Sequence, residues 1–278
     1  MPLTVEDHRR DIAGMTYVYP VVSRRAGGVS VGINLNPNNA CNWRCIYCQV
    51  PGLTRGGPPP LDLRQLEDEL RRMLDGIVNG GFMAERVPEG LRTFADVAFS
   101  GNGEPTSARE FPAAVVTVAR LLREFGLMGR VKMRLITNGS LLERASVRDG
   151  IAVIGQAGGE VWFKLDAASP AAMLRINGTR QKPEAVLRRL ALCAELCETW
   201  VQSCFFALNG KPPGESEIAG YLGMLETAKA SIAGVHIYSL ARPSCQPEAP
   251  MLDRLPAAWL DALAKRVRAL GLTAQVSP

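Results

Sequence analysis

Short apolar runs alternate with segments of helical periodicity along most of this chain, and this alternation limits the possible folds more than any other feature. The runs that we interpret as strands are 29–36, 95–100, 130–137, 160–166, 200–208 and 234–241. Helical spacing of apolar residues appears near 61–79, 107–125, 140–149, 169–175, 183–198 and 215–229. This order predicts βα units and a parallel sheet. Six such units either close partway into a barrel or lie open as a doubly wound sheet, and in both cases ligands gather beyond the carboxyl ends of the strands.

A last helix is expected at 256–270, because Pro256 suits a first helical turn and Gly271 suits a helix end. We therefore divide the 278 residues into an N-terminal lead-in (1–28), a core barrel (29–245) and a C-terminal extension (246–278). The extension consists of the helix and a short tail, which we expect to pack on the core.

The composition is that of an ordinary globular protein, with 47% hydrophobic and 21% charged residues. No apolar run approaches the roughly 20 residues that a membrane-spanning helix needs. The first residues lack the apolar core of a signal peptide, so we expect a cytoplasmic protein without a membrane partner. The net charge of +5 suits an anionic substrate, a nucleic acid or a plain solvated surface.

Several expected strands carry polar side chains on one face, which is unusual for buried parallel strands. Period-two alternation places Ser30, Gly32, Asn34 and Asn36 on one face of the first strand, Lys164 and Asp166 on one face of the fourth, and His236, Tyr238 and Arg242 on one face of the last. Either these are edge strands with one solvated face, or the interior of the sheet holds a polar ligand. We expect Asn34, Asn36, Lys164, Asp166, Tyr238 and Arg242 to line one cavity.

Three cysteines, Cys41, Cys45 and Cys48, follow the first strand with the spacing C-x3-C-x2-C. Thiolates suit zinc or iron–sulfur clusters. Structural zinc takes four protein ligands, but the chain has only two histidines, His8 and His236, and no fourth cysteine nearby. A disulfide with one cysteine left over is a further alternative. The pattern favours a cluster with three protein ligands and one open iron.

The cysteine motif, with Tyr47 before its last cysteine, resembles the signature of the radical S-adenosylmethionine (SAM) superfamily. Three later segments resemble motifs of that family in the expected order: "SGNGEPT" (100–106), "LITNGS" (135–140) and "FKLDA" (163–167), the last with Lys164 in place of serine. Longer stretches look like the iron–sulfur oxidoreductase branch that contains the wyosine-forming tRNA enzymes. The resemblance covers roughly residues 17–245 and implies an α/β fold, a partial (β/α)6 barrel of parallel strands with outer helices, plus the C-terminal helix.

The resemblance implies that Cys41, Cys45 and Cys48 hold a [4Fe–4S] cluster whose fourth iron binds SAM. An electron from the cluster then cleaves SAM, and the resulting 5′-deoxyadenosyl radical takes a hydrogen atom from the substrate. Further residues are assigned by analogy: Gly101, Asn102, Gly103 and Glu104 to the methionine ammonium, Tyr47 to the adenine, Asn138, Lys164 and Asp166 to the ribose and carboxylate of SAM. Lys164, Asp166 and Arg242 are the catalytic candidates, and Arg242 is expected to bind a carboxylate or phosphate with two parallel hydrogen bonds.

The resemblance leaves the substrate open among a tRNA base, a small metabolite, a peptide and a glycine of a partner enzyme. It also implies an external electron donor similar to flavodoxin or ferredoxin. The alternative from another class is a cysteine-ligated metal or electron-transfer protein without SAM chemistry. A second cluster would draw on Cys193, Cys197, Cys204 and Cys245, but Cys193 and Cys197 share an apolar stripe with Leu190, and Cys245 is expected to be the most exposed thiol.

Overall fold

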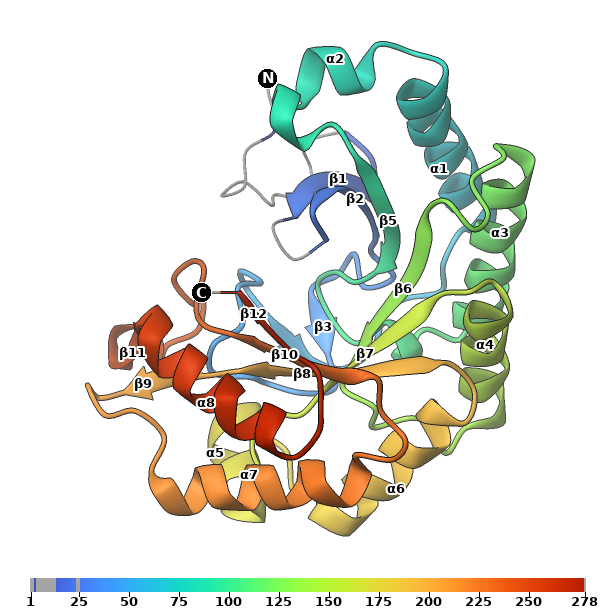
Figure 1. The fold of residues 1–278 in the computed structure, drawn as a ribbon. Coiled ribbons are helices and arrows are strands. Elements are labelled where there is room, and N and C mark those ends of the chain that lie inside the picture. Colours follow the sequence, from blue (N-terminus) through green and yellow to red (C-terminus); the bar gives the residue numbers. More distant parts are fainter. Residues whose placement is uncertain (1–2, 4–13, 24–25, 278) are drawn as a thin grey trace.

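The computed structural model of the chain describes residue 3, residues 14–23 and residues 26–277. Half of the expected N-terminal lead-in, including His8, lies outside the described residues. One sheet of eight strands organises the described part, in the spatial order β1-β2-β5-β6-β7-β8-β10-β12. The sheet curls into an open half-barrel with β1 and β12 at its two edges (Figure 1), and this confirms the expected partial barrel.

All six expected strands are present in this sheet. The eight strands are β1 (Val18–Ser23), β2 (Gly28–Ile33), β5 (Phe94–Phe99), β6 (Lys132–Thr137), β7 (Glu160–Lys164), β8 (Glu198–Cys204), β10 (Gly234–Tyr238) and β12 (Ala274–Ser277). Neighbours from β2 to β12 pair in parallel, whereas β1 pairs with β2 in the antiparallel sense. The parallel strands therefore present their carboxyl ends at the same rim.

Two strands of the sheet, β1 and β12, were not predicted. The sequence of β1 contains Pro20, and a proline within an apolar run argues against a central strand. The structure resolves this conflict, because β1 is an edge strand and tolerates a residue without a backbone N–H. Strand β12 is only four residues long and extends the sheet beside β10. The expected strand 200–208 divides into β8 and the short β9 (Phe206–Leu208), which pairs with β11 (Leu252–Arg254).

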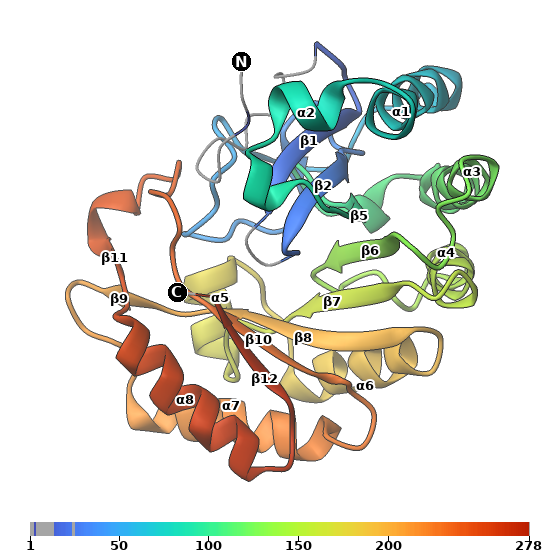
Figure 2. The same ribbon diagram turned by 45° about the horizontal axis from the view of Figure 1, so that its top comes forward.

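The helices cover the convex outer face of the sheet (Figure 2). They are α1 (Leu63–Val78), α2 (Phe82–Arg86), α3 (Phe111–Glu124), α4 (Ala145–Gln156), α5 (Pro170–Asn177), α6 (Pro183–Ala194), α7 (Glu215–Ala228) and α8 (Ala257–Ala269). The prediction for α4 was wrong at its start. Residues 138–140 form a tight turn instead, in which Asn138 Oδ1 accepts a hydrogen bond from Ser140 N at 3.0 Å and Gly139 has a φ of 68°.

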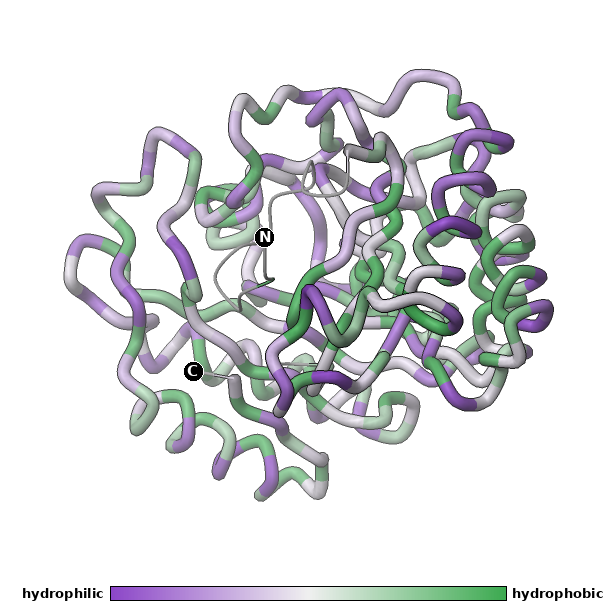
Figure 3. The backbone as a smooth tube through the Cα atoms, turned by 90° about the horizontal axis from the view of Figure 1, so that it is seen from above, coloured by the Kyte–Doolittle hydropathy of each residue, from purple (hydrophilic) through white to green (hydrophobic). Residues whose placement is uncertain are grey.

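The two faces of the sheet differ in polarity, as the alternation predicted. Val31, Ile33 and Leu35 belong to the main hydrophobic core between sheet and helices, whereas Ser30 points into an inner cavity. The helices alternate hydrophilic and hydrophobic turns when viewed from above (Figure 3), as expected for helices that pack one face on a core. In the described part of the chain, no helix has both the length and the apolar character that a membrane span requires.

Candidate active site

The cysteine loop begins at the rim where β2 ends. Cys41 closes the short strand β3 (Ala40–Cys41), which pairs with β4 (Thr54–Arg55). The loop is then attached to the end of α5, because Arg44 N and Ile46 N donate to the carbonyl oxygens of Asn177 and Ile176 at 3.0 and 2.9 Å. These contacts leave all three thiols partly exposed, and all three line one cavity.

The donor set of this loop fits an iron–sulfur cluster. In the described part of the chain, no three His, Cys, Asp or Glu side chains are arranged to hold a single metal ion. A structural zinc ion needs four ligands converging at about 2.0–2.3 Å, whereas a [4Fe–4S] cluster held by three cysteines takes one thiolate on each of three irons and spreads its ligands over a larger volume. Burial raises the pKa of Cys41 to about 11 and that of Cys45 to about 12, so a bound metal centre would displace thiol protons.

A second segment, residues 242–248, holds the cysteine loop from the other side; we call it the clamp segment. Ser244 Oγ donates to the Ile46 carbonyl at 2.7 Å, Cys245 N donates to the Cys48 carbonyl at 2.8 Å, and Gln246 Nε2 donates to the Val50 carbonyl at 3.1 Å. The two guanidinium nitrogens NH1 and NH2 of Arg44 bind the Glu248 carboxylate at 2.8 and 3.0 Å. The clamp segment was not predicted, since its members lie almost 200 residues after the loop.

The turn 101–104 packs directly against the start of the cysteine loop. A Cβ atom on Gly103 would lie 2.1 Å from the Ala40 carbonyl oxygen, and one on Gly101 would lie 2.3 Å from Asn34 Oδ1. Only glycine allows these backbones to approach so closely. Asn102 strengthens the contact, because its Nδ2 donates to Asn39 Oδ1 at 2.6 Å. The turn therefore lies beside the thiols and lines the same cavity.

Glu104 is buried at the base of this cavity. Its Oε1 accepts hydrogen bonds from the hydroxyls of Thr106 and Thr137, both at 2.6 Å, and its Oε2 accepts one from Asn138 N at 2.7 Å. Burial raises the pKa of the carboxyl group, and these hydrogen bonds oppose the shift. The carboxyl group is thus held in one orientation by neighbours on both sides.

Asn138 connects the end of β6 to the cysteine loop. Its Nδ2 donates to Asn42 Oδ1 at 2.9 Å, and Asn42 Nδ2 donates to Ser140 Oγ at 2.8 Å. Asn42 was not singled out from the sequence. Its position directly after Cys41 in the motif is the signal that would have pointed to it.

A charged cluster joins the cysteine loop to β7 and β10. Lys164 Nζ donates to the Tyr238 hydroxyl at 3.1 Å and lies 5.0 Å from the centre of the Tyr47 ring. Burial alone would lower the pKa of Lys164, but the attraction of Asp166, whose Oδ1 lies 3.8 Å away, raises it above its usual range. Lys164 therefore remains an ammonium ion at neutral pH.

Asp166 is enclosed by donors. Tyr47 Oη donates to its Oδ2 at 2.5 Å, Asn177 Nδ2 donates to the same oxygen at 2.8 Å, and Cys204 N donates to its Oδ1 at 2.9 Å. Its carboxylate is fully buried. Asp166 lines a second cavity, bounded by α5 and α7, and is absent from the lining of the first.

The expectation that six side chains line one cavity is correct for Lys164, Tyr238 and Arg242. It is wrong for Asp166, Asn34 and Asn36. The two asparagines shape the turn after β2, because Asn34 Oδ1 accepts from the backbone N–H groups of Asn36 and Asn102 at 3.1 and 3.0 Å. Their amides are therefore used within the protein.

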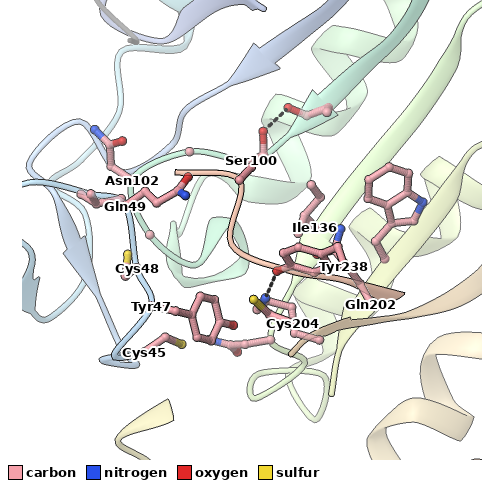
Figure 4. A pocket seen from close by; sticks show the side chains of 18 of the residues that line it. Cys45, Tyr47, Cys48, Gln49, Ser100, Asn102, Ile136, Gln202, Cys204 and Tyr238 are labelled. Carbon is pink, nitrogen blue, oxygen red and sulfur yellow. Dashed lines mark hydrogen bonds between the residues drawn. The ribbon is translucent and has the colours of Figure 1, made fainter. Parts of the chain in front are cut away.

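The first cavity has a volume of about 340 Å³, within the size range of small-molecule sites. The predicted residues that line it are Cys41, Cys45, Tyr47, Cys48, Gly101, Asn102, Gly103, Glu104, Asn138, Lys164, Tyr238 and Arg242. Figure 4 shows Cys45, Cys48 and Gln49 on one side and Ile136, Gln202 and Tyr238 on the other. Arg242 is linked to the cysteine loop, since its NH2 donates to Gln49 Oε1 at 2.6 Å.

The other four cysteines are dispersed. Cys193 and Cys197 are buried in the core behind the sheet, where burial raises the pKa of each to about 12. Cys204 lines the inner cavity, and Cys245 is exposed in the clamp segment, as predicted. Within the described residues, no three of the four come together as metal ligands.

Comparison with known sequences identifies a family. The sequence profile of the radical SAM superfamily matches residues 35–219. Among curated proteins, the chain is 25% identical over 134 residues to the GTPase Obg of Brachyspira hyodysenteriae. It is 29% identical over 158 residues to UPF0026 protein MJ1312 of Methanocaldococcus jannaschii. These alignments cover 48% and 57% of this chain, but they span only 17% and 42% of the two relatives.

Solved structures share the fold at low sequence identity. A radical SAM methyltransferase from Sphaerobacter thermophilus superposes with a TM-score of 0.56 at 14% identity, over 94% of this chain and 68% of that one. The FeFe-hydrogenase maturase HydG from Carboxydothermus hydrogenoformans gives 0.51 at 11% identity, over 89% of this chain and 52% of that one. The profile match covers more than half of the chain and contains the cysteine loop, the turn 101–104 and the ends of β6 and β7. The chain therefore belongs to the radical SAM superfamily.

Proposed function

We propose that this radical SAM enzyme acts on a polar substrate bound inside the half-barrel, next to the cysteine loop. Members of the family use a [4Fe–4S] cluster and SAM, and this chain uses the same cofactors. One observation carries the proposal: the three thiols, the turn 101–104 and several charged side chains of the strands line a single cavity. A site for the cofactors and a polar space for a substrate are therefore continuous.

Bound at Cys41, Cys45 and Cys48, the cluster together with SAM would supply the radical chemistry that removes a hydrogen atom from the substrate. The chain contributes the ligands Cys41, Cys45 and Cys48 and holds their loop rigid. Glu104 would accept a hydrogen bond from the methionine ammonium of SAM, because a buried carboxylate fixed by four donors needs little reorganisation to bind a cation. Lys164 offers a permanent positive charge to the carboxylate of SAM.

Three further roles rest on position in the cavity lining. Tyr47 faces the adenine, and its ring is fixed by the hydrogen bond to Asp166. Asn138 donates to or accepts from the ribose hydroxyls. Arg242 is both a support of the cysteine loop through Gln49 and a contact for an anionic part of the substrate.

A polar substrate is supported by the charges in the lining. Asp96, Arg134, Lys164 and Arg242 all contribute to the cavity, and even paired ionised groups lose favourable hydration when hydrocarbon covers them. A tRNA base, a metabolite or a peptide side chain meets this requirement, and a lipid chain does not. An external flavodoxin- or ferredoxin-like protein supplies the electron.

The test is anaerobic reconstitution with iron and sulfide, followed by incubation with SAM and a reductant. We expect about four irons and four sulfides per chain and slow release of 5′-deoxyadenosine. The triple variant of Cys41, Cys45 and Cys48 to alanine should lose both, whereas the control Cys245→Ala should keep both. A triple variant that retains a full cluster would show that other cysteines are the ligands. Substrates are then identified by transfer of deuterium from candidate compounds into 5′-deoxyadenosine.

A further inference from the structure

The inner cavity continues from the cysteine loop into the interior of the half-barrel. Beyond Lys164 and Tyr238 its lining includes side chains from the middle of the strands: Ser30, Asp96, Arg134, Trp162 and Gln202. Each belongs to the inward-facing set of its strand, and together they come from β2, β5, β6, β7 and β8. No motif of the sequence analysis accounts for this deeper part of the cavity.

The charged groups of this deeper part neutralise one another. Arg134 binds both Asp96 and Glu160, Ser30 Oγ donates to Asp96, and Trp162 Nε1 donates to Glu160 at 2.9 Å. Two carboxyl groups therefore share one guanidinium, and the group leaves no surplus positive charge. An anionic ligand would gain no attraction here.

Gln202 is the exception among these polar side chains. The residue is 1% exposed, and within the described part of the chain its side-chain nitrogen has no hydrogen-bond partner. In the sheet it lies between Lys164 on β7 and His236 on β10. A buried N–H without an acceptor costs free energy unless a ligand or water satisfies it. Gln202 thus belongs to the cavity lining and carries a donor that no described residue uses.

Aromatic rings bound the same region. The imidazole of His236 lies between Trp162 and Trp200. Its centre is 4.6 Å from the ring centre of Trp162 and 4.8 Å from that of Trp200. Trp162 itself lines the cavity. An aromatic edge beside a lone amide donor suits a flat group that carries one acceptor.

We infer that Gln202 forms a substrate subsite that binds an uncharged carbonyl oxygen on a flat group, such as an amide or a heterocyclic carbonyl. This inference rests on the proposed function, because it names the part of the substrate that reaches farthest into the half-barrel. The amide of Gln202 donates to the carbonyl oxygen, and the edge of Trp162, a ring flanked by His236 and Arg134, contacts the flat group. A carboxylate in the same place would meet Asp96 and Glu160, whose charges offset Arg134, while the neighbouring Lys164 is already paired with Asp166.

The test compares benzamide with benzoate, which share their shape and differ in charge. The reconstituted, SAM-bound protein is labelled with 15N-glutamine, and the side-chain signal of Gln202 is identified by its loss in Gln202→Met. We expect benzamide to shift this signal with a dissociation constant on the order of 1 mM and benzoate to bind at least about five-fold more weakly. In Gln202→Met, benzamide affinity measured by saturation-transfer NMR should fall about five- to ten-fold.

A control and a separate readout make the result unambiguous. Gln275→Met, at an exposed position on the edge strand β12, should bind benzamide like the unmodified protein. Equal benzamide affinity in Gln202→Met overturns the subsite, and tighter binding of benzoate overturns its preference for an uncharged group. Iron content and SAM affinity are measured on the same samples. If the protein binds neither the cluster iron nor SAM, the proposed function is contradicted. If it binds both but does not bind benzamide, only the subsite is contradicted.

Discussion

Replacing Asp166 with alanine should destabilise the whole protein, because this carboxylate is a structural centre of the half-barrel. It accepts hydrogen bonds from the Tyr47 hydroxyl, the Asn177 amide and the backbone N–H of Cys204. It also faces the ammonium of Lys164 at 3.8 Å. Asp166→Ala removes all of these interactions and leaves a buried cation without a counter-charge.

The magnitude follows from that last consequence. Removing one partner of a buried ion pair costs about 3–5 kcal/mol of the free energy of unfolding. For a chain of this size, each kcal/mol lowers the melting temperature by about 2–4 °C, so Asp166→Ala should melt roughly 6–20 °C below the unmodified protein. Asp166→Asn keeps an acceptor oxygen but loses the charge, and we expect an intermediate decrease.

The assay is thermal unfolding followed by circular dichroism under anaerobic conditions, with iron content measured in parallel. Asp253→Ala is the control, since this aspartate is exposed and substitutions at such positions usually change stability by less than about 0.5 kcal/mol. A melting temperature of Asp166→Ala within about 2 °C of the control would refute the reasoning. It would mean that Lys164 finds another partner or loses its proton at no cost.

Three further outcomes test other parts of the site. Glu104→Gln should weaken SAM binding about ten- to hundred-fold in calorimetric titration, the scale of one charge-assisted hydrogen bond, and unchanged affinity at unchanged iron content would contradict the assignment of Glu104. Ser244→Ala should accelerate loss of the cluster to a chelator several-fold, because it removes two of the hydrogen bonds that attach the clamp segment to the cysteine loop; an unchanged rate would show that these two bonds do not support the loop. Cys245 should react readily with a thiol reagent at pH 8, whereas Cys193 and Cys197 should stay protonated and protected until unfolding, since burial raises the pKa of both to about 12. Modification of Cys193 in the folded protein, detected by mass spectrometry, would contradict this burial.

The position of the Asp166 carboxylate relative to the cavity depends on tertiary structure, and no local sequence pattern reveals it. The sequence places Lys164 and Asp166 on one face of a strand, and this led to the expectation that both point into one cavity. In the structure the two side chains do face each other, with Asp166 Oδ1 3.8 Å from Lys164 Nζ. The Asp166 carboxylate does not line the first cavity because it is fully buried among its donors Tyr47, Asn177 and Cys204.

The sequence alone determined the order of the βα units and the place of the cysteine loop. Both depend on local features: apolar runs of strand length, helical spacing of apolar residues, and three thiols within eight residues at a strand end. The same local features indicated Glu104 and Asn138, which follow the next two strands of the core and therefore reach the same rim of the sheet.

Only the tertiary structure decided which segments meet. The clamp segment touches the cysteine loop across almost 200 residues of chain, and Gln202 lines the cavity because its strand lies between β7 and β10. Neither residue spacing nor periodicity encodes such contacts, because they depend on how far the sheet curls and on which side chains already have partners. Gln202 is distinguished from the other buried polar residues of the cavity by the lack of a partner for its nitrogen among the described residues, a property that exists only once the strands are assembled.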